Sequence, residues 1–324
     1  MIQKSAARFL ALLSMATFTA CTSSCFVSAG ESEAAGQTEI VVFAAKSLNT
    51  VLDESIIPAF QSLHPDVTVI PSYDSSGTLM MQIEEGAECD VFFSAAQKQM
   101  NELEQMGFIE EGTRNDIVNN QVCVVTFDGS GTKVTGLKDL AAASSMALAD
   151  GSVPVGKYTR EALVASNLID APADGDVSAI TTAEISDALG GLEINECANV
   201  GAVTAAVSEG ANEVGTVYYS DTFGLEDRLV ILEKVPSSLT GDVIYPAAQI
   251  VNEDADEAQK KAAAAFAAFL TSDEAKQIFE SYYFDTSFGE DTAQTQTETE
   301  VKTAAETEQE AETETGAGTA TETE

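Results

Sequence analysis

Two turns that contain serine offer the clearest chemistry in this sequence. Ser47 follows the apolar run 41–45, and the apolar residues after it recur at helical spacing. This pattern predicts a buried strand that leads directly into a helix with Ser47 at its N-cap. Backbone N–H groups at the start of a helix have no partner within it, and the helix dipole adds positive potential there. A hydroxyl beside such groups makes a site that can bind an anion without a cation.

A second turn repeats this arrangement around Ser76. It follows the apolar run 67–71 and precedes a segment, 79–85, that we expect to be helical. A third strand is predicted over 90–94, with a helix over 96–106. Three successive strand–helix units predict a parallel, doubly wound α/β sheet. Ligands of such sheets bind at the carboxyl ends of the strands, which is where both serines lie.

The second half of the chain supplies another set of α/β elements. We expect strands at 122–127, 146–149, 215–219 and 229–232, and helices at 137–145, 154–164, 182–189 and 200–207. The extended segment 243–246 then returns to the first unit, which the helices 257–270 and 273–282 complete. The sequence therefore predicts two lobes, one of residues 37–122 with 243–288 and the other of residues 123–242.

The two ends of the chain differ from this α/β body. Lys4 and Arg8 precede an apolar run at 9–20 that is too short to span a membrane, and the run ends at Cys21. Residues 1–21 resemble a lipoprotein signal peptide with Cys21 as the lipidated residue; cleavage after Ala29 is the alternative, and both export the protein. We expect residues 22–36 to be a linker. Thr and Glu dominate residues 289–324, a composition that predicts a disordered acidic tail.

Charge and motifs exclude several classes of function. The formal net charge of −38 argues against nucleic acid and anionic lipid surfaces as partners. Cys89, Cys123 and Cys197 occur singly, without the paired spacing of a zinc site. They could be three buried thiols, or two of them could form a disulfide. An S-x-x-K sequence at 130–133 lies in a Gly-rich turn, where a catalytic serine of that class is not found. We expect no enzymatic activity.

Five segments, in this order and spacing, resemble one family. They are 42–48 (VFAAKSL), 75–79 (SSGTL) with 82–84 (QIE), 90–95 (DVFFSA), 153–158 (VPVGKY) and 215–221 (GTVYYSD). Together they look like the molybdate-binding proteins that deliver their ligand to an ABC transporter. The resemblance covers about residues 39–284. It implies a two-lobed periplasmic-binding-protein clamp, in which each lobe is a mostly parallel sheet flanked by helices and the chain crosses the hinge twice.

The resemblance also implies a ligand and its site. Molybdate or tungstate would be held by Ser47 and Ser76 of the first lobe and by Val155, Val200 and Tyr218 of the second. The two valines can act only through backbone N–H groups. No cofactor and no metal other than that of the oxyanion is implied. The partner would be a membrane permease, and the protein a monomer attached by lipid to the outer face of the bacterial cell membrane.

Some features leave alternatives open. Val155 stands where the family usually has Ala, Lys46 where a small residue is common, and Tyr283 where Gly is usual. Sulfate or phosphate is therefore the alternative ligand. Protonated phosphate would require an acceptor, which Asp74 or Asp221 could supply if turned inward. Each serine could also be a helix cap and nothing more.

Overall fold

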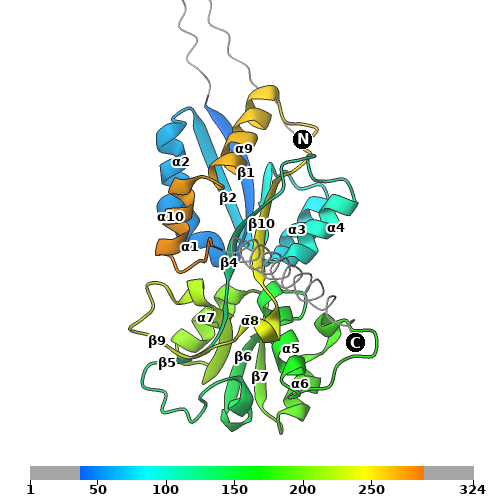
Figure 1. Cartoon of the computed structure of the whole chain (residues 1–324), viewed down its shortest axis with the longest axis vertical. Helices are drawn as coiled ribbons and strands as arrows, with labels where there is room; N and C mark the ends of the chain where they lie inside the picture. The colour runs from blue at the N-terminus through cyan, green and yellow to red at the C-terminus, as the bar shows by residue number, and fades with distance from the viewer. Residues whose placement is uncertain (1–36, 288–324) are drawn as a thin grey trace, which may run out of the picture. The chain divides into compact units, whose positions relative to one another are not determined.

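Ten strands form two five-stranded sheets in residues 37–287, the part of the chain that the computed structural model describes (Figure 1). The predictions for residues 1–36 and 289–324 lie outside the described residues. The first sheet has the order β2-β1-β3-β10-β4 and the second the order β7-β6-β8-β5-β9. The strands of the first sheet are β1 Thr38–Ala45, β2 Val67–Asp74, β3 Val91–Phe93, β4 Asn115–Asn120 and β10 Val243–Gln249. Those of the second are β5 Val122–Phe127, β6 Ser145–Ala149, β7 Glu193–Cys197, β8 Val214–Tyr218 and β9 Leu229–Lys234.

Helices accompany both sheets. The first lobe carries α1 Asn49–Val51, α2 Ile57–Leu63, α3 Ser76–Glu84, α4 Gln97–Gln105, α9 Glu257–Phe269 and α10 Asp273–Ser281. The second carries α5 Pro154–Ala165, α6 Thr182–Ala188, α7 Val200–Ser208 and α8 Ser237–Thr240. Short 3-10 turns are η1 Lys46–Leu48, η3 Leu137–Ala142, η4 Val177–Ala179 and η5 Tyr219–Thr222, and η2 Leu52–Ile56 is a π-helical turn. In the described part of the chain, no helix is both long and apolar enough to cross a membrane.

Strand β1 lies inside the sheet, between β2 and β3, and is buried on both faces, which explains its apolar sequence. Ile40, Val42 and Ala44 belong to a core cluster that includes residues of α2, α9 and α10. Phe43, on the opposite face, belongs to a second cluster with residues of α3 and α4. Because successive side chains of a strand point to opposite faces, β1 packs against one layer of helices on each side of the sheet. It thereby fixes the place of η1, which follows it directly.

Both sheets are mixed. In the first sheet, β2, β1 and β3 are parallel, whereas β10 is antiparallel to both of its neighbours. The second sheet repeats this pattern with β5 as the reversed strand. The prediction of two lobes, each with a mostly parallel sheet flanked by helices, is therefore confirmed, with one strand reversed in each sheet.

Two strands were not predicted, β4 and β7. Both lie at the edge of a sheet, and both have mostly polar sequences, NDIVNN and EINEC. An edge strand exposes one of its sides to solvent, so the apolar runs that identified the central strands are missing. The helix expected over 137–145 is a 3-10 turn that ends at Ala142, and Ser145 already belongs to β6.

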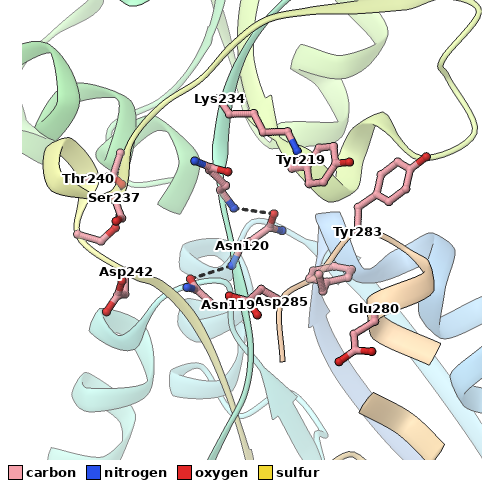
Figure 2. Close-up of a pocket in the computed structure, with 13 residues that line it drawn as sticks. Asn119, Asn120, Tyr219, Lys234, Ser237, Thr240, Asp242, Glu280, Tyr283 and Asp285 are labelled. Atoms are coloured by element: carbon pink, nitrogen blue, oxygen red, sulfur yellow. Dashed lines mark hydrogen bonds between the residues drawn. The ribbon is translucent and has the colours of Figure 1, made fainter. Parts of the chain in front are cut away.

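The chain passes between the sheets at two places. Gln121 alone separates β4 from β5, and the return lies between α8 and β10. A pocket of about 630 Å³ lies beside these crossings, and Figure 2 shows Asn120, Tyr219 and Tyr283 at its wall. Tyr283 has a φ of +70°, a conformation that favours glycine. Its ring stacks on Tyr219 with 4.7 Å between the centroids, which helps to hold it in this conformation.

Candidate functional site

All five residues predicted to bind the ligand line one cavity. Ser47 and Ser76 reach it from the first sheet's elements, and Val155, Val200 and Tyr218 from those of the second. The cavity is small, about 10 Å³, which is roughly the space that a single water molecule requires. Its other lining residues are Ala45, Lys46, Ser75, Ala95, Val153 and Pro154. The geometry thus brings together residues that are up to 171 positions apart in the sequence (from 47 to 218).

The two valines lie at the starts of helices, as expected. Val155 is the second residue of α5 and Val200 the first residue of α7, so neither N–H has a partner within its own helix. Asn199 caps α7 by accepting a hydrogen bond from the N–H of Ala202, at 3.0 Å. Val153, at the N-cap of α5, has no side chain that can do this. Both helices therefore present backbone donors and the positive ends of their dipoles at the cavity.

The expectation that Ser47 is an N-cap is wrong. Ala45 occupies that position, and Ser47 lies within the 3-10 turn η1. The helical turn begins two residues earlier than predicted, directly after Ala45, the last residue of β1. The Ser47 Oγ lies instead 2.9 Å from the Tyr245 hydroxyl.

Ser76 is not a cap either. Ser75 caps α3 by accepting from the N–H of Thr78 at 3.1 Å, and Ser76 is the first helical residue. The Ser76 Oγ accepts a hydrogen bond from the N–H of Ala95 at 2.9 Å. A hydroxyl that accepts from the protein keeps its own hydrogen available for another partner. The interpretation of these two serines as helix caps only is therefore excluded.

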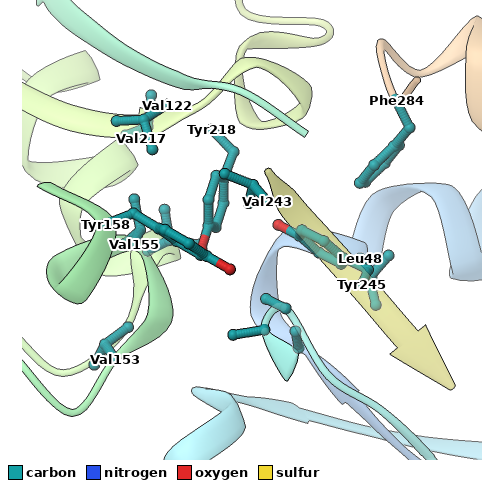
Figure 3. Packing of buried hydrophobic residues seen from close by; sticks show 14 of the residues in the cluster. Leu48, Val122, Val153, Val155, Tyr158, Val217, Tyr218, Val243, Tyr245 and Phe284 are labelled. Atoms are coloured by element: carbon teal, nitrogen blue, oxygen red, sulfur yellow. The ribbon is translucent and has the colours of Figure 1, made fainter. Parts of the chain in front are cut away.

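Tyr218 is the most unusual residue of the site. It is 1% exposed, and its hydroxyl has no hydrogen-bond partner among residues 37–287. A buried polar atom without a partner costs about 1–3 kcal/mol, so such atoms are rare in folded proteins. Burial raises the pKa of Tyr218 well above its ordinary value, and the group is therefore a neutral donor at physiological pH. Figure 3 shows the Tyr218 and Tyr245 rings, which meet edge to face with 5.7 Å between their centroids.

Neither candidate carboxylate lines the cavity. Asp74 Oδ1 accepts from the N–H of Ser75 at 2.7 Å and from Asn199 Nδ2 at 3.1 Å, which joins the two lobes. Asp221 Oδ2 accepts from the N–H of Tyr218 at 2.9 Å. Burial raises the pKa of Asp221 to about 7, although the hydrogen bond from the Tyr218 N–H and the nearby Lys46 charge oppose this shift. Both side chains are therefore occupied in holding the backbone around the site.

Lys46 is the one cationic side chain among the residues that line the cavity. Its ammonium group lies over the Tyr73 ring, 5.9 Å from the centroid. Its aliphatic part lies close to Gly201, where an added Cβ would meet it at 2.9 Å. Lys46 thus adds local positive potential in a protein of strongly negative net charge.

Arg160 supports the site and was missed by sequence reasoning. It is 1% exposed, although arginine is almost never fully buried. Its guanidinium donates to three carbonyl oxygens, those of Ile180 at 2.8 Å and of Ala149 and Gly156 at 2.9 Å. These bonds fasten the end of β6 to the first turn of α5. The only sequence signal is an arginine within an otherwise apolar helix face.

The thiols and acidic groups of residues 37–287 form neither a disulfide nor a metal-binding cluster. Cys89, Cys123 and Cys197 are buried free thiols, so the disulfide left open above is not formed. Among residues 37–287, no cluster of three or more His, Cys, Asp or Glu side chains could hold a metal ion. The cavity's potential partners are thus hydroxyl and N–H donors, a set that suits an anion.

Comparison with known proteins agrees with this chemistry. Residues 40–285 match the family model described as bacterial extracellular solute-binding protein. The chain belongs to this family. Over 263 residues it is 30% identical to the molybdate-binding protein ModA of Escherichia coli, a match that covers 77% of this chain and 90% of ModA. A protein of Bacillus subtilis, YvgL, described as an ABC transporter substrate-binding lipoprotein, is 28% identical over 246 residues, 76% of this chain and 85% of YvgL.

A solved structure extends the comparison. The substrate-binding domain ascribed to a molybdenum ABC transporter of Clostridium difficile is 30% identical, with a TM-score of 0.56. The match covers 76% of this chain and 98% of that domain. This solute-binding protein therefore shares its fold, two lobes each with a mixed sheet, with a solved structure of similar sequence.

We predict that Arg160→Met destabilises the solute-binding protein by roughly 2–5 kcal/mol, because three buried carbonyl groups lose a charged donor. Urea unfolding followed by circular dichroism measures this change. Arg114→Met is the matched control, since the half-buried Arg114 donates to the side chains of Glu104, Gln97 and Asn101 and to no buried carbonyl group. Equal effects of the two substitutions would contradict the role given to Arg160.

We also predict that Asp221 makes stability depend on pH. Its folded pKa of about 7 lies above the ordinary value of 3.8, so the folded state binds the proton more tightly. The resulting stabilisation is present below about pH 4 and is lost as the pH rises through about 7. The half-buried side chain keeps some contact with water, which reduces the size of the effect.

Asp221→Asn retains an acceptor for the N–H of Tyr218 and removes the charge. The expected result is a larger gain in melting temperature at pH 8 than at pH 5, measured by differential scanning calorimetry. Asp227→Asn, an exposed carboxylate nearby, is the control and should show no such difference. The same gain at both pH values would show that the Asp221 charge is not destabilising.

Proposed function

We propose that this protein captures molybdate or tungstate between its two lobes and delivers it to the permease of an ABC transporter. The observation that carries the proposal is the buried Tyr218 hydroxyl, which has no partner among residues 37–287 and lies in a cavity also lined by the hydroxyl donors Ser47 and Ser76 and by two helix starts. An oxyanion bound there would accept from Tyr218, Ser47 and Ser76 and from the N–H groups of Val155 and Val200. The E. coli relative, at 30% identity, is named a molybdate-binding protein, which supports the same ligand.

The donor set favours a fully deprotonated dianion. Molybdate and tungstate offer only acceptors near neutral pH, whereas phosphate still carries a proton under these conditions. That proton requires an acceptor, and neither Asp74 nor Asp221 lines the cavity. Sulfate has the same charge but shorter bonds and stronger hydration, so fixed donors reach it less well and its desolvation costs more.

Ligand binding is proposed to close the two lobes, with the first crossing at Gln121, slightly before the expected boundary at 122: residues 37–120 with 243–287 and residues 122–242. A ligand shifts a conformational equilibrium only when it binds one state more tightly than the other. Because donors come from both lobes, an oxyanion would bind the closed state more tightly. The crossings at Gln121 and before β10 would serve as the hinge.

Export and anchoring complete the proposal. The N-terminal sequence supports a signal peptide and lipid attachment at Cys21, and the family is extracellular. The protein would act as a monomer held on the outer face of the cell membrane, without enzymatic activity. Mass spectrometry of the mature protein should show a lipid-modified N-terminal Cys21. A mature chain that starts after Ala29 would exclude the lipid anchor but would still agree with export of the protein.

Calorimetric titration with molybdate, tungstate, sulfate and phosphate tests the function. We expect tight binding of the first two and much weaker binding of the others. Tight binding of phosphate, abolished by Asp221→Asn, would replace the molybdate assignment with a phosphate one. Turnover of a bound ester would replace the transport function with catalysis.

Tyr218→Phe gives the sharpest variant for this test. The hydroxyl has no hydrogen-bond partner among residues 37–287, so its removal should leave the stability of the free protein unchanged or raise it. Affinity for molybdate should fall by about 1.5–3 kcal/mol, roughly 10- to 100-fold, since a hydrogen bond to a charged ligand is lost. Tyr282→Phe is the control, because that hydroxyl contacts Ser55 and Glu54 outside the cavity. Unchanged affinity in Tyr218→Phe would remove Tyr218 from the site.

A further inference from the structure

A chain of buried hydrogen bonds leads from the crossing between the sheets to Ser47. Asn120, the last residue of β4, donates from Nδ2 to the Tyr245 hydroxyl at 3.3 Å. The Tyr245 hydroxyl in turn lies 2.9 Å from Ser47 Oγ. Tyr245 is fully buried, and Asn120 is 8% exposed. Neither residue lines the cavity, yet Tyr245 contacts Ser47, which does.

The orientation of the Asn120 amide follows from its partners. Its Oδ1 accepts from the backbone N–H of Gln121 at 2.8 Å and from that of Ser220 at 3.5 Å. An N–H group can only donate, so the oxygen must face these two groups. The Nδ2 group therefore faces the two hydroxyls, those of Tyr245 and of Ser220, the latter at 2.8 Å.

This orientation determines the direction of the next bond. Tyr245 accepts from Asn120, and Ser47 Oγ is the only other partner of its hydroxyl in the described part of the chain. If Tyr245 did not donate to Ser47, its hydrogen would be buried without an acceptor, which costs about 1–3 kcal/mol. Tyr245 thus donates to Ser47, and the Ser47 hydrogen remains free to turn into the cavity.

We propose that Tyr245, held by Asn120, is a positioning residue that makes Ser47 a hydrogen-bond donor to the oxyanion. This inference rests on the proposed function. The chain Asn120–Tyr245–Ser47 polarises each successive hydroxyl toward the ligand, which strengthens the last bond. Asn120 also donates a hydrogen bond to Ser220 of the second lobe. The residue that orients the Tyr245 hydroxyl therefore contacts both lobes. Figures 2 and 3 show Asn120 and Tyr245, respectively, in their surroundings.

A double-mutant cycle measured by calorimetric titration with molybdate tests this role. Tyr245→Phe should weaken binding roughly 3- to 10-fold, the effect of one neutral hydrogen bond. In a Ser47→Ala background the same substitution should cause no further loss, because the donor that it positions is gone. A merely structural effect of Tyr245 would persist in that background. Tyr282→Phe, which removes a Tyr–Ser hydrogen bond of the same kind to Ser55, should leave affinity unchanged.

The outcomes separate this inference from the proposed function. Wild-type affinity in Tyr245→Phe, or an equal loss with and without Ser47, would overturn the positioning role alone. If the wild-type protein binds another dianion of the panel instead of molybdate, the cycle is run with that dianion and decides the role in the same way. If it binds none of the four oxyanions, both the function and the positioning role are rejected.

Discussion

Hydrogen-bond donors that converge on one buried cavity are the constraint on which the rest of this structure depends. In the described part of the chain the Tyr218 hydroxyl has no hydrogen-bond partner, and the starts of α5 and α7 add backbone groups that their own helices cannot satisfy. Such an arrangement is unfavourable until an acceptor enters. Each lobe supplies only part of the donor set, so the fold must bring both lobes to the same point.

The residues around the cavity hold these donors in place, and their carboxylate groups lie outside it. Asp74 and Asp221 could offer acceptors, but neither lines the cavity, and each instead accepts a hydrogen bond from a backbone N–H group beside it. Arg160 fastens the turn that carries Val155, through three carbonyl oxygens of different segments. The strongly negative net charge makes such local control necessary, since the field of the whole chain repels an anion.

Sequence reasoning succeeded where the signal is local. The apolar runs of β1 and β8 identify buried strands, and Pro154 marks the start of α5 because its ring suits the first helical turn. The edge strands β4 and β7 were not predicted, because a half-exposed strand needs few apolar residues. Ser47 was placed at the wrong helical position, since a 3-10 turn and a helix start share the same apolar pattern.

The supporting residues could not be predicted from spacing at all. Tyr245 is 198 positions from Ser47, and Asn120 is 125 positions from Tyr245. Their pairing depends on β10 returning to lie beside β4 in antiparallel orientation. Val155 and Val200 were found only through the resemblance to a known family, because an apolar side chain gives no hint that its backbone N–H is free.

Diffraction from crystals grown with molybdate, recorded at the molybdenum absorption edge, tests the central claim most directly. We expect one strong anomalous peak in the cavity, from a molybdate ion whose oxygens lie within hydrogen-bonding distance of the Tyr218, Ser47 and Ser76 hydroxyls. A protein that binds molybdate in solution but shows the peak elsewhere, with these hydroxyls uninvolved, would contradict it.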